Sequence, residues 1–305
     1  MSDFYGVLPA LMTPFTEDGS AIDTEALRAY VERLIAAGVG GLVPGGSTGE
    51  FTTLSSAERR QLVDVTVQAT AGRVPVVAGT GALSTRETVE LSVHAERAGA
   101  AAVMVVPPFY DPLSWRELQA HYAAIADAIN VPIMYYNLPS VSGVRLTAQQ
   151  LRALPVTCLK DTGGDATAAT ELIQTGAPTL LNGYDTQTFH ALAAGVQAVV
   201  WGTASIIPEQ CVELHRLLID AIDLPAAREL WARIWPICQL LESVSYVAGV
   251  KAGCRLVGDT TGPVRAPLLE LEDDAARRLA AAIELCLEPA QPRRQQRLEL
   301  LGLGG

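Results

Sequence analysis

Lysine is nearly absent from this sequence. Of the 22 Lys and Arg residues in a chain of 305, only Lys160 and Lys251 are lysines, so arginine carries almost all of the positive charge. A guanidinium cannot give up its proton, whereas a lysine amine becomes a neutral nucleophile when burial lowers its pKa. Each lysine is therefore a candidate for chemistry that arginine cannot perform. The alternative at either position is a lysine paired with a carboxylate.

Other scarcities exclude whole classes of protein. The five cysteines are widely spaced and form no Cys-x-x-Cys pair, which is typical of reduced thiols and favours a cytoplasmic location. The four histidines stand singly, without a His-x-His or His-Glu-x-x-His motif, so we expect no metal and no other cofactor. The longest apolar runs fall short of the roughly 18 residues of a membrane span, and the N-terminus lacks the basic region of a signal peptide.

Positive charge is outnumbered by negative charge. The chain has 33 acidic residues, a net charge of −11 and a pI of about 4.9. Nucleic-acid binding depends on basic patches that neutralise phosphates, so we expect no nucleic-acid partner. Hydrophobic residues make up 49% of the chain and charged residues 18%, which favours a large packed core over disorder.

Short apolar runs alternate with helical patterns over the first 220 residues. The runs are almost continuously apolar, as buried parallel strands are, and cover residues 7–15, 41–46, 74–80, 101–107, 132–137, 157–161, 179–183 and 198–202. Ser or Thr with Glu or Gln three residues later marks helix starts, as at Ser55, Ser84, Ser114 and Thr147. Eight such units predict a (β/α)8 TIM barrel over residues 1–222. A doubly wound open sheet is the alternative.

The end of the chain follows a different pattern. Residues 208–220 fit the eighth barrel helix, and no strand pattern follows them. Helical spacing over residues 225–242, 244–257 and 273–287 predicts an appended C-terminal three-helix segment within residues 223–288. The tail at 289–305 mixes Pro, Arg, Gln and Gly, and we assign it no function.

Polar residues gather where the predicted strands end, and these ends face one common mouth in such a barrel. Lys160 ends the sixth run, and the second run ends in Gly45-Gly46-Ser47-Thr48-Gly49-Glu50. Glycines let the backbone approach a ligand, and the N–H groups and hydroxyls from Gly46 to Thr48 suit a carboxylate or phosphate. A simple glycine turn is the alternative.

Tyrosine and further polar residues complete the predicted mouth. Strand alternation directs one of Tyr135 and Tyr136 into the barrel. Asp185 and Ser205, after the last two strands, are expected to line the far end of the substrate. Together these groups suit a carbonyl acid: the amine attacks the ketone, the hydroxyl turn holds the carboxylate and the phenol moves protons.

Several motifs, in order, resemble one known family. GGSTGE at 45–50, YYNLP at 135–139, LKDTGGD at 159–165 and GPVRAPL at 262–268 resemble the dihydrodipicolinate synthase and N-acetylneuraminate lyase family, over about residues 4–285. The resemblance implies a class I, Schiff-base lyase or aldolase that acts on pyruvate without a metal. It also implies a homotetramer built as a dimer of dimers.

The resemblance assigns roles to single residues. Lys160 matches the Schiff-base lysine and Tyr136 the tyrosine that relays protons. Ser47 and Thr48 match the hydroxyl pair that grips the carboxylate. Tyr110 matches a tyrosine that reaches into a neighbouring subunit's site.

Val200 lies where a backbone carbonyl faces the site in this family, whereas other positions depart from the family pattern. Val141 stands where synthases carry an arginine for the second substrate, so that substrate would lose a hydrogen bond worth roughly 1.5–3 kcal/mol. Arg145 is close by in the sequence. Thr186 stands where neuraminate lyases carry an acid.

The resemblance therefore predicts an aldolase that joins pyruvate to an aldehyde, or releases it from a 4-hydroxy-2-oxo (2-oxo-3-deoxy) acid. A 4-hydroxy-tetrahydrodipicolinate (dihydrodipicolinate) synthase, a 2-oxo-3-deoxy sugar-acid dehydratase and a non-catalytic ligand sensor are the alternatives. Lys251 lies at no predicted strand end, so we expect it to be structural.

Overall fold

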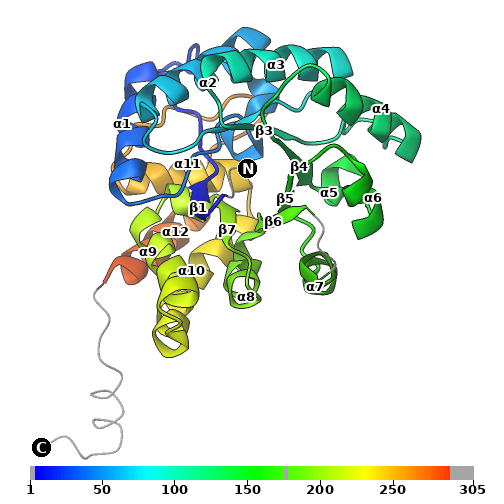
Figure 1. The fold of residues 1–305 in the computed structure, drawn as a ribbon. Coiled ribbons are helices and arrows are strands. Elements are labelled where there is room, and N and C mark those ends of the chain that lie inside the picture. Colours follow the sequence, from blue (N-terminus) through cyan, green and yellow to red (C-terminus); the bar gives the residue numbers. More distant parts are fainter. Residues whose placement is uncertain (1–3, 175–177, 289–305) are drawn as a thin grey trace, which may run out of the picture.

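The computed structural model describes residues 4–174 and 178–288. Seven parallel strands form a single sheet in the order β1-β7-β6-β5-β4-β3-β2 (Figure 1). They are β1 (Gly6–Pro9), β2 (Val77–Gly79), β3 (Ala102–Val105), β4 (Ile133–Asn137), β5 (Cys158–Asp161), β6 (Thr179–Asn182) and β7 (Ala198–Trp201). Each of β2 to β7 lies inside one of the predicted apolar runs, and β1 begins one residue before its run.

The remaining predicted run, residues 41–46, closes the sheet into a barrel. Leu42 pairs in parallel with Val76 before β2, and Val43 pairs with Ala10 after β1. The Val43 N–H donates to the Pro9 carbonyl, and the Val77 N–H donates to the Leu42 carbonyl. The segment is too short and too rich in glycine to form a regular strand, but it occupies the position of the eighth strand in the barrel. The predicted (β/α)8 barrel is confirmed.

Helices surround the strands (Figure 1). They are α1 (Thr24–Ala36), α2 (Ser56–Thr70), α3 (Thr85–Ala98), α4 (Trp115–Ala126), α5 (Pro139–Ser142), α6 (Ala148–Ala153), α7 (Ala166–Gln174), α8 (Thr188–Ala193) and α9 (Pro208–His215). The predicted capping boxes at Ser55, Ser114 and Thr147 are present in full. At Ser84 the side chain accepts the Glu87 N–H, which is half of the predicted motif.

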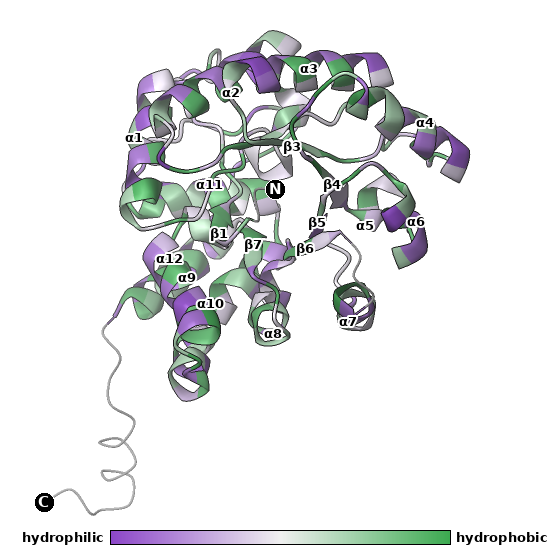
Figure 2. Ribbon diagram, in the orientation of Figure 1, coloured by the Kyte–Doolittle hydropathy of each residue, from purple (hydrophilic) through white to green (hydrophobic). Residues whose placement is uncertain are grey.

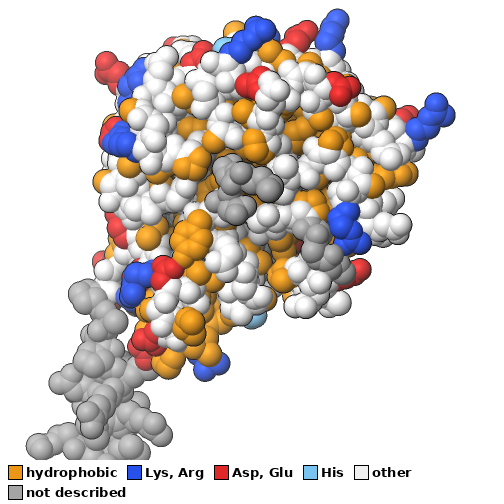
Figure 3. Space-filling view, viewed as in Figure 1, with side chains coloured by type: hydrophobic (Ala, Val, Ile, Leu, Met, Phe, Trp, Pro, Cys, Tyr) orange, Lys and Arg blue, Asp and Glu red, His pale blue; other side chains and the backbone are white. Residues whose placement is uncertain are grey.

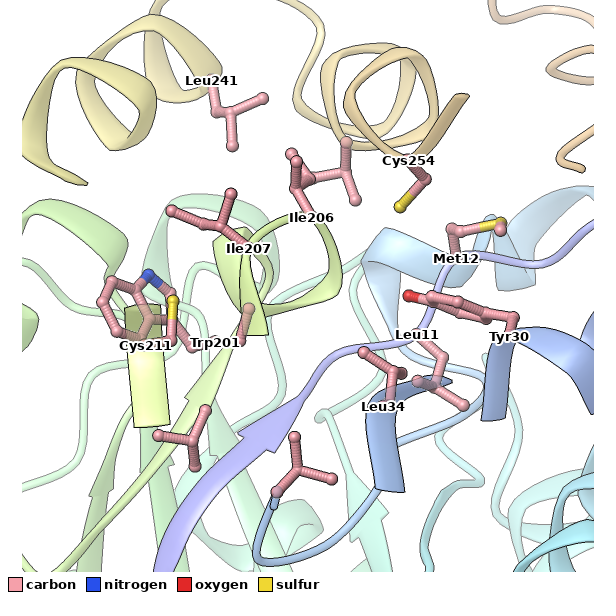
Figure 4. Close-up of a cluster of buried hydrophobic side chains, with 14 of the residues drawn as sticks. Leu11, Met12, Tyr30, Leu34, Trp201, Ile206, Ile207, Cys211, Leu241 and Cys254 are labelled. Carbon is pink, nitrogen blue, oxygen red and sulfur yellow. The ribbon is translucent and has the colours of Figure 1, made fainter. Parts of the chain in front are cut away.

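The C-terminal helices are α10 (Leu224–Ser243), α11 (Tyr246–Leu256) and α12 (Asp273–Leu287), close to the predicted bounds. α10 packs on α12, and one apolar cluster joins these helices to the barrel. Figure 4 shows that cluster, in which Leu11, Tyr30, Trp201, Leu241 and Cys254 converge from both parts of the chain. The division at residue 222 remains a prediction, and the tail at 289–305 lies outside the described residues.

Apolar side chains lie inside and outside the barrel wall. The interior holds Leu8, Met104, Met134 and Leu181, among others, and alternate residues of the same strands pack against the helices. Figure 2 shows the hydrophobic residues on the strands and on the inward faces of the helices. On the face drawn in Figure 3, Lys and Arg side chains are scattered among acidic ones and do not form a basic patch. None of the described helices is long and apolar enough to cross a membrane.

Candidate active site

Lys160 and Tyr136 lie side by side inside the barrel. Lys160 is on β5 and is in register with Tyr136 on β4, so the two side chains leave the sheet on the same face. Nζ of Lys160 lies 4.1 Å from the centre of the Tyr136 ring. The two residues are 4% and 5% exposed. Tyr135 points the other way and packs against Tyr122 of α4. The phenol ring thus forms one wall around the amine.

Three buried residues have polar side-chain groups without a hydrogen-bonding partner in the described part of the chain. Across residues 4–174 and 178–288, no hydrogen bond is made by the amine of Lys160 or by the side-chain hydroxyls of Tyr136 and Thr48. Each of these residues is at most 5% exposed. Their three polar atoms are not among the fully enclosed ones, so they are available to a ligand.

The lysine side chain rests against a glycine. A Cβ added at Gly183, just after β6, would lie 2.6 Å from Cε and 2.8 Å from Cγ of Lys160. Any larger side chain at this position would push the amine away from its place beside Tyr136. Gly183 therefore sets the position of Lys160 from the side opposite the phenol.

A buried acid lies beyond this glycine. Oδ2 of Asp185 accepts hydrogen bonds from the Thr203 N–H (3.1 Å), the Thr203 hydroxyl (2.5 Å) and the Tyr246 hydroxyl (2.9 Å). Burial raises the pKa of Asp185, while its donors and the charge of Lys160 oppose this rise. Gly202 leaves the space for Tyr246, because a Cβ there would lie 2.0 Å from the Tyr246 hydroxyl. The group forms a fixed polar layer behind the lysine.

The turn that carries Ser47 and Thr48 is a single 3-10 turn, Ser47–Gly49. The N–H groups that open such a turn have no partner within it. Gly45 has a φ of +73°, and a Cβ at Gly46 would lie 3.2 Å from the Met104 side chain inside the barrel. Glycines thus bring this backbone against the interior. The Thr13 hydroxyl donates to the Gly49 carbonyl at 2.7 Å and fixes the far end of the turn.

The second lysine is fully engaged. Nζ of Lys251 on α11 donates to Glu50 Oε1 at 2.6 Å and to the Pro263 carbonyl at 2.8 Å, and it lies 4.1 Å from the Phe15 ring centre. Both side chains of the ion pair are 0% exposed. Burial lowers the pKa of Lys251, and the neighbouring Glu50 opposes that shift. Lys251 is held as a structural ammonium, which leaves Lys160 as the available amine.

The other predicted site residues are in different surroundings. Val200 on β7 is buried in the barrel interior, where Leu8 is its partner in register. Ser205 is fully buried, and its hydroxyl donates to the Ala10 carbonyl, so it does not open onto the mouth. Asp185 is likewise occupied by protein donors. Tyr110 lies in the loop after β3 and is 85% exposed.

Val141, which departs from the family pattern, and Arg145, its neighbour in the sequence, both lie on the surface. Val141 on α5 is 50% exposed. Arg145 is exposed and borders a separate cavity together with Asn137, Thr147 and Asp161. Burial raises the pKa of Asp161, although Asn137 donates to it at 2.7 Å.

In the described parts of the chain, no group of three or more His, Cys, Asp or Glu side chains is arranged to hold a metal.

Sequence reasoning missed three contributors to this site: Gly183, Glu50 and Tyr246. Gly183 ends a predicted apolar run and Glu50 ends the GGSTGE motif, yet no pattern reveals that Gly183 touches Lys160 or that Glu50 binds Lys251. Tyr246 comes from a C-terminal helix, 61 residues from its partner Asp185. Only the packing of α11 against the barrel brings it there.

Comparison with known proteins gives a consistent result. A model described as the dihydrodipicolinate synthetase family matches residues 3–285. A 4-hydroxy-tetrahydrodipicolinate synthase of Methanopyrus kandleri is 39% identical over 276 residues, which cover 88% of this chain and 92% of that protein.

Solved structures agree in fold. The dihydrodipicolinate synthase DapA-2 of Bacillus anthracis has a TM-score of 0.89 and 30% identity, covering 95% of this chain and 100% of that one. The dihydrodipicolinate synthase of Acinetobacter baumannii, solved in complex with pyruvate, has a TM-score of 0.87 and 30% identity, covering 93% and 99%.

Proposed function

The chain belongs to the dihydrodipicolinate synthetase family and is a carbon–carbon lyase, and on that premise we propose that Lys160 forms a Schiff base with pyruvate. One observation carries the proposal. The Lys160 amine is buried beside Tyr136 with no protein partner among the described residues, whereas Lys251 is fully paired. A buried, unpaired amine at the end of a barrel strand is arranged to react with a carbonyl.

The proposed reaction starts from the free amine of Lys160 and regenerates it at the end. The neutral amine of Lys160 adds to C2 of pyruvate, and uptake of one proton with loss of water leaves an iminium. The iminium is the electron sink, so C3 loses a proton, through Tyr136 and Thr48, to give an enamine. The enamine carbon attacks the aldehyde carbon, whose oxygen takes up a proton. Hydrolysis of the new iminium then releases a 4-hydroxy-2-oxo acid and a proton and restores the neutral amine. The reverse sequence splits such an acid into pyruvate and aldehyde.

The carboxylate of pyruvate is proposed to bind at the Ser47–Thr48 turn. Its two hydroxyls and its first N–H groups supply hydrogen bonds to an anion without a counter-charge, and Gly46 allows close approach. The carbonyl of Val200 is proposed to face the same ligand. We propose no metal and no other cofactor, because the iminium does the polarising that a Lewis acid would otherwise do.

We propose two candidates for the aldehyde partner. A neutral aldehyde suits the mouth, because Val141 supplies no hydrogen-bond donor. The second candidate is 4-hydroxy-tetrahydrodipicolinate synthesis, which is favoured by the similarity to proteins named 4-hydroxy-tetrahydrodipicolinate synthase. Parallel assays separate them: pyruvate release from a panel of 4-hydroxy-2-oxo acids, and consumption of aspartate semialdehyde with pyruvate. Cyclised product from aspartate semialdehyde at a higher kcat/KM than any release reaction would favour the synthase.

We further propose a cytoplasmic homotetramer. All five cysteines are buried free thiols, which suits a reducing compartment. Tyr110 is largely exposed and is proposed to reach a neighbouring subunit's site. Sedimentation velocity tests the assembly, and a monomer at micromolar concentration with full activity would contradict it.

A further inference from the structure

The carboxylate-binding turn is held from outside the barrel by a buried ion pair. Glu50 directly follows the Ser47–Gly49 turn, and its N–H donates to the Ser47 carbonyl at 3.1 Å. Its backbone is left-handed, with a φ of +56°, which is uncommon for a residue other than glycine. Such a conformation persists only where the surroundings fix it.

Both carboxylate oxygens of Glu50 are fixed by residues more than 200 positions away. Oε1 accepts from Nζ of Lys251 on α11 at 2.6 Å, and Oε2 accepts from the Arg265 N–H at 2.9 Å. The Lys251 amine is fixed in turn by the Pro263 carbonyl at 2.8 Å and by the Phe15 ring. No atom of either ion-pair side chain is exposed, so solvent does not weaken the contact.

We propose that Lys251 and Glu50 are positioning residues, whose ion pair ties the Ser47–Thr48 turn to α11 and holds it where it receives the carboxylate of the keto acid. The inference rests on the proposed function of that turn. It gives the C-terminal helices a role in substrate binding although none of their side chains need touch pyruvate. It also explains the second lysine: an ammonium fits three fixed partners, whereas a guanidinium brings five donors.

The test must separate positioning from stability. Lys251→Met alone leaves a buried carboxylate unpaired, and that variant is expected to unfold readily. Lys251→Met combined with Glu50→Gln removes both charges and keeps an oxygen for the Arg265 N–H, so stability should largely return. The matched control is Arg33→Met combined with Asp259→Asn. It removes another ion pair, from α1 to the turn after α11, at 2.9 Å from Nε to Oδ1, and leaves residues 45–50 untouched.

Two readouts apply to each protein. The first is the pyruvate concentration that half-saturates borohydride trapping, measured by intact mass. The double variant should need about tenfold more pyruvate, the scale expected for misplaced binding groups, with a similar rate at saturation. The second readout requires no ligand: the amides of Gly49 and Glu50 should exchange hydrogen about tenfold faster. The control variant should match wild type in both.

The outcomes distinguish this inference from the proposed function. If wild type is not trapped with pyruvate, the proposed function fails, and amide exchange alone decides whether the ion pair positions the turn. If wild type is trapped, and the double variant has wild-type half-saturation and wild-type exchange at Gly49 and Glu50, only the positioning role is overturned. The positioning role is also overturned if the double variant, which lacks both charges, is half-saturated at the wild-type pyruvate concentration, whatever its exchange rate.

Discussion

A single methyl group at position 183 should displace the reactive amine. Gly183 has no left-handed φ, so alanine can adopt its backbone conformation without strain. The added Cβ would lie 2.6 Å from Cε of Lys160 and 2.8 Å from Thr162 Oγ1. Ordinary contact begins at 3.4 Å, so Cε must retreat by 3.4 − 2.6 = 0.8 Å. The amine would then leave its place 4.1 Å from the Tyr136 ring centre.

The size of the effect follows from this displacement. Overpacking of a buried site costs about 1–3 kcal/mol of stability, so Gly183→Ala should remain folded with a lower Tm. Misplacing a reacting group by about 1 Å costs on the order of 100-fold in rate. The initial rate of borohydride trapping at saturating pyruvate should therefore fall about 100-fold. The pyruvate concentration that half-saturates trapping should change little, because the Ser47–Thr48 turn is untouched.

The matched control is Gly249→Ala on α11. Its Cβ would lie 2.8 Å from Leu241 Cδ2, a similar overlap away from Lys160. This variant should lose stability and keep its trapping rate within about twofold, since overpacking acts locally. A folded Gly183→Ala protein that is trapped as fast as wild type would refute the idea that this glycine sets the position of Lys160.

The remaining predictions concern the proton relay, the two lysines and a buried histidine. Tyr136→Phe keeps the ring over the amine, so trapping should persist, while exchange of the pyruvate methyl protons in D2O, followed by NMR, should slow about 100-fold or more; unchanged exchange would remove Tyr136 from the relay. Lys160→Arg should abolish trapping in a protein that still folds, whereas Lys251→Arg should not abolish it, as intact mass will show. Burial lowers the pKa of His121 to about 4. The unfolded chain takes up that proton near pH 6.5, so stability should fall by up to about 3 kcal/mol as pH drops from 6.5 to 4. His121→Gln should flatten the Tm profile in that window, and an equally steep profile would exclude His121 as the cause.

Local signals in the sequence predicted most of the fold. Capping boxes such as that at Ser55 and the apolar runs are short-range features, and the structure has helices and strands where they predict them. Residues 41–46 illustrate the limit. Their pairing on both sides depends on ring closure, a global property, and not on their own strand propensity. The alternation that directs Tyr136 inward and Tyr135 outward is likewise local, so sequence alone predicts that one of them enters the barrel.

The candidate site was less accessible to sequence. The scarcity of lysine marked Lys160 and Lys251 alike, and the predicted strand end favoured Lys160. Their surroundings add what no pattern shows: one amine is unpaired among the described residues, and the other is bound by Glu50 and Pro263. The hydroxyl of Ser205 faces the Ala10 carbonyl, because the strand end turns it into the wall. Such side-chain directions arise from tertiary packing, which no motif encodes.

The most direct test of the central claim is covalent. Wild-type protein treated with pyruvate and borohydride should gain the mass of one reduced pyruvate adduct per chain, and peptide mapping should place it on Lys160. An unchanged intact mass, or an adduct on Lys251, would contradict the account.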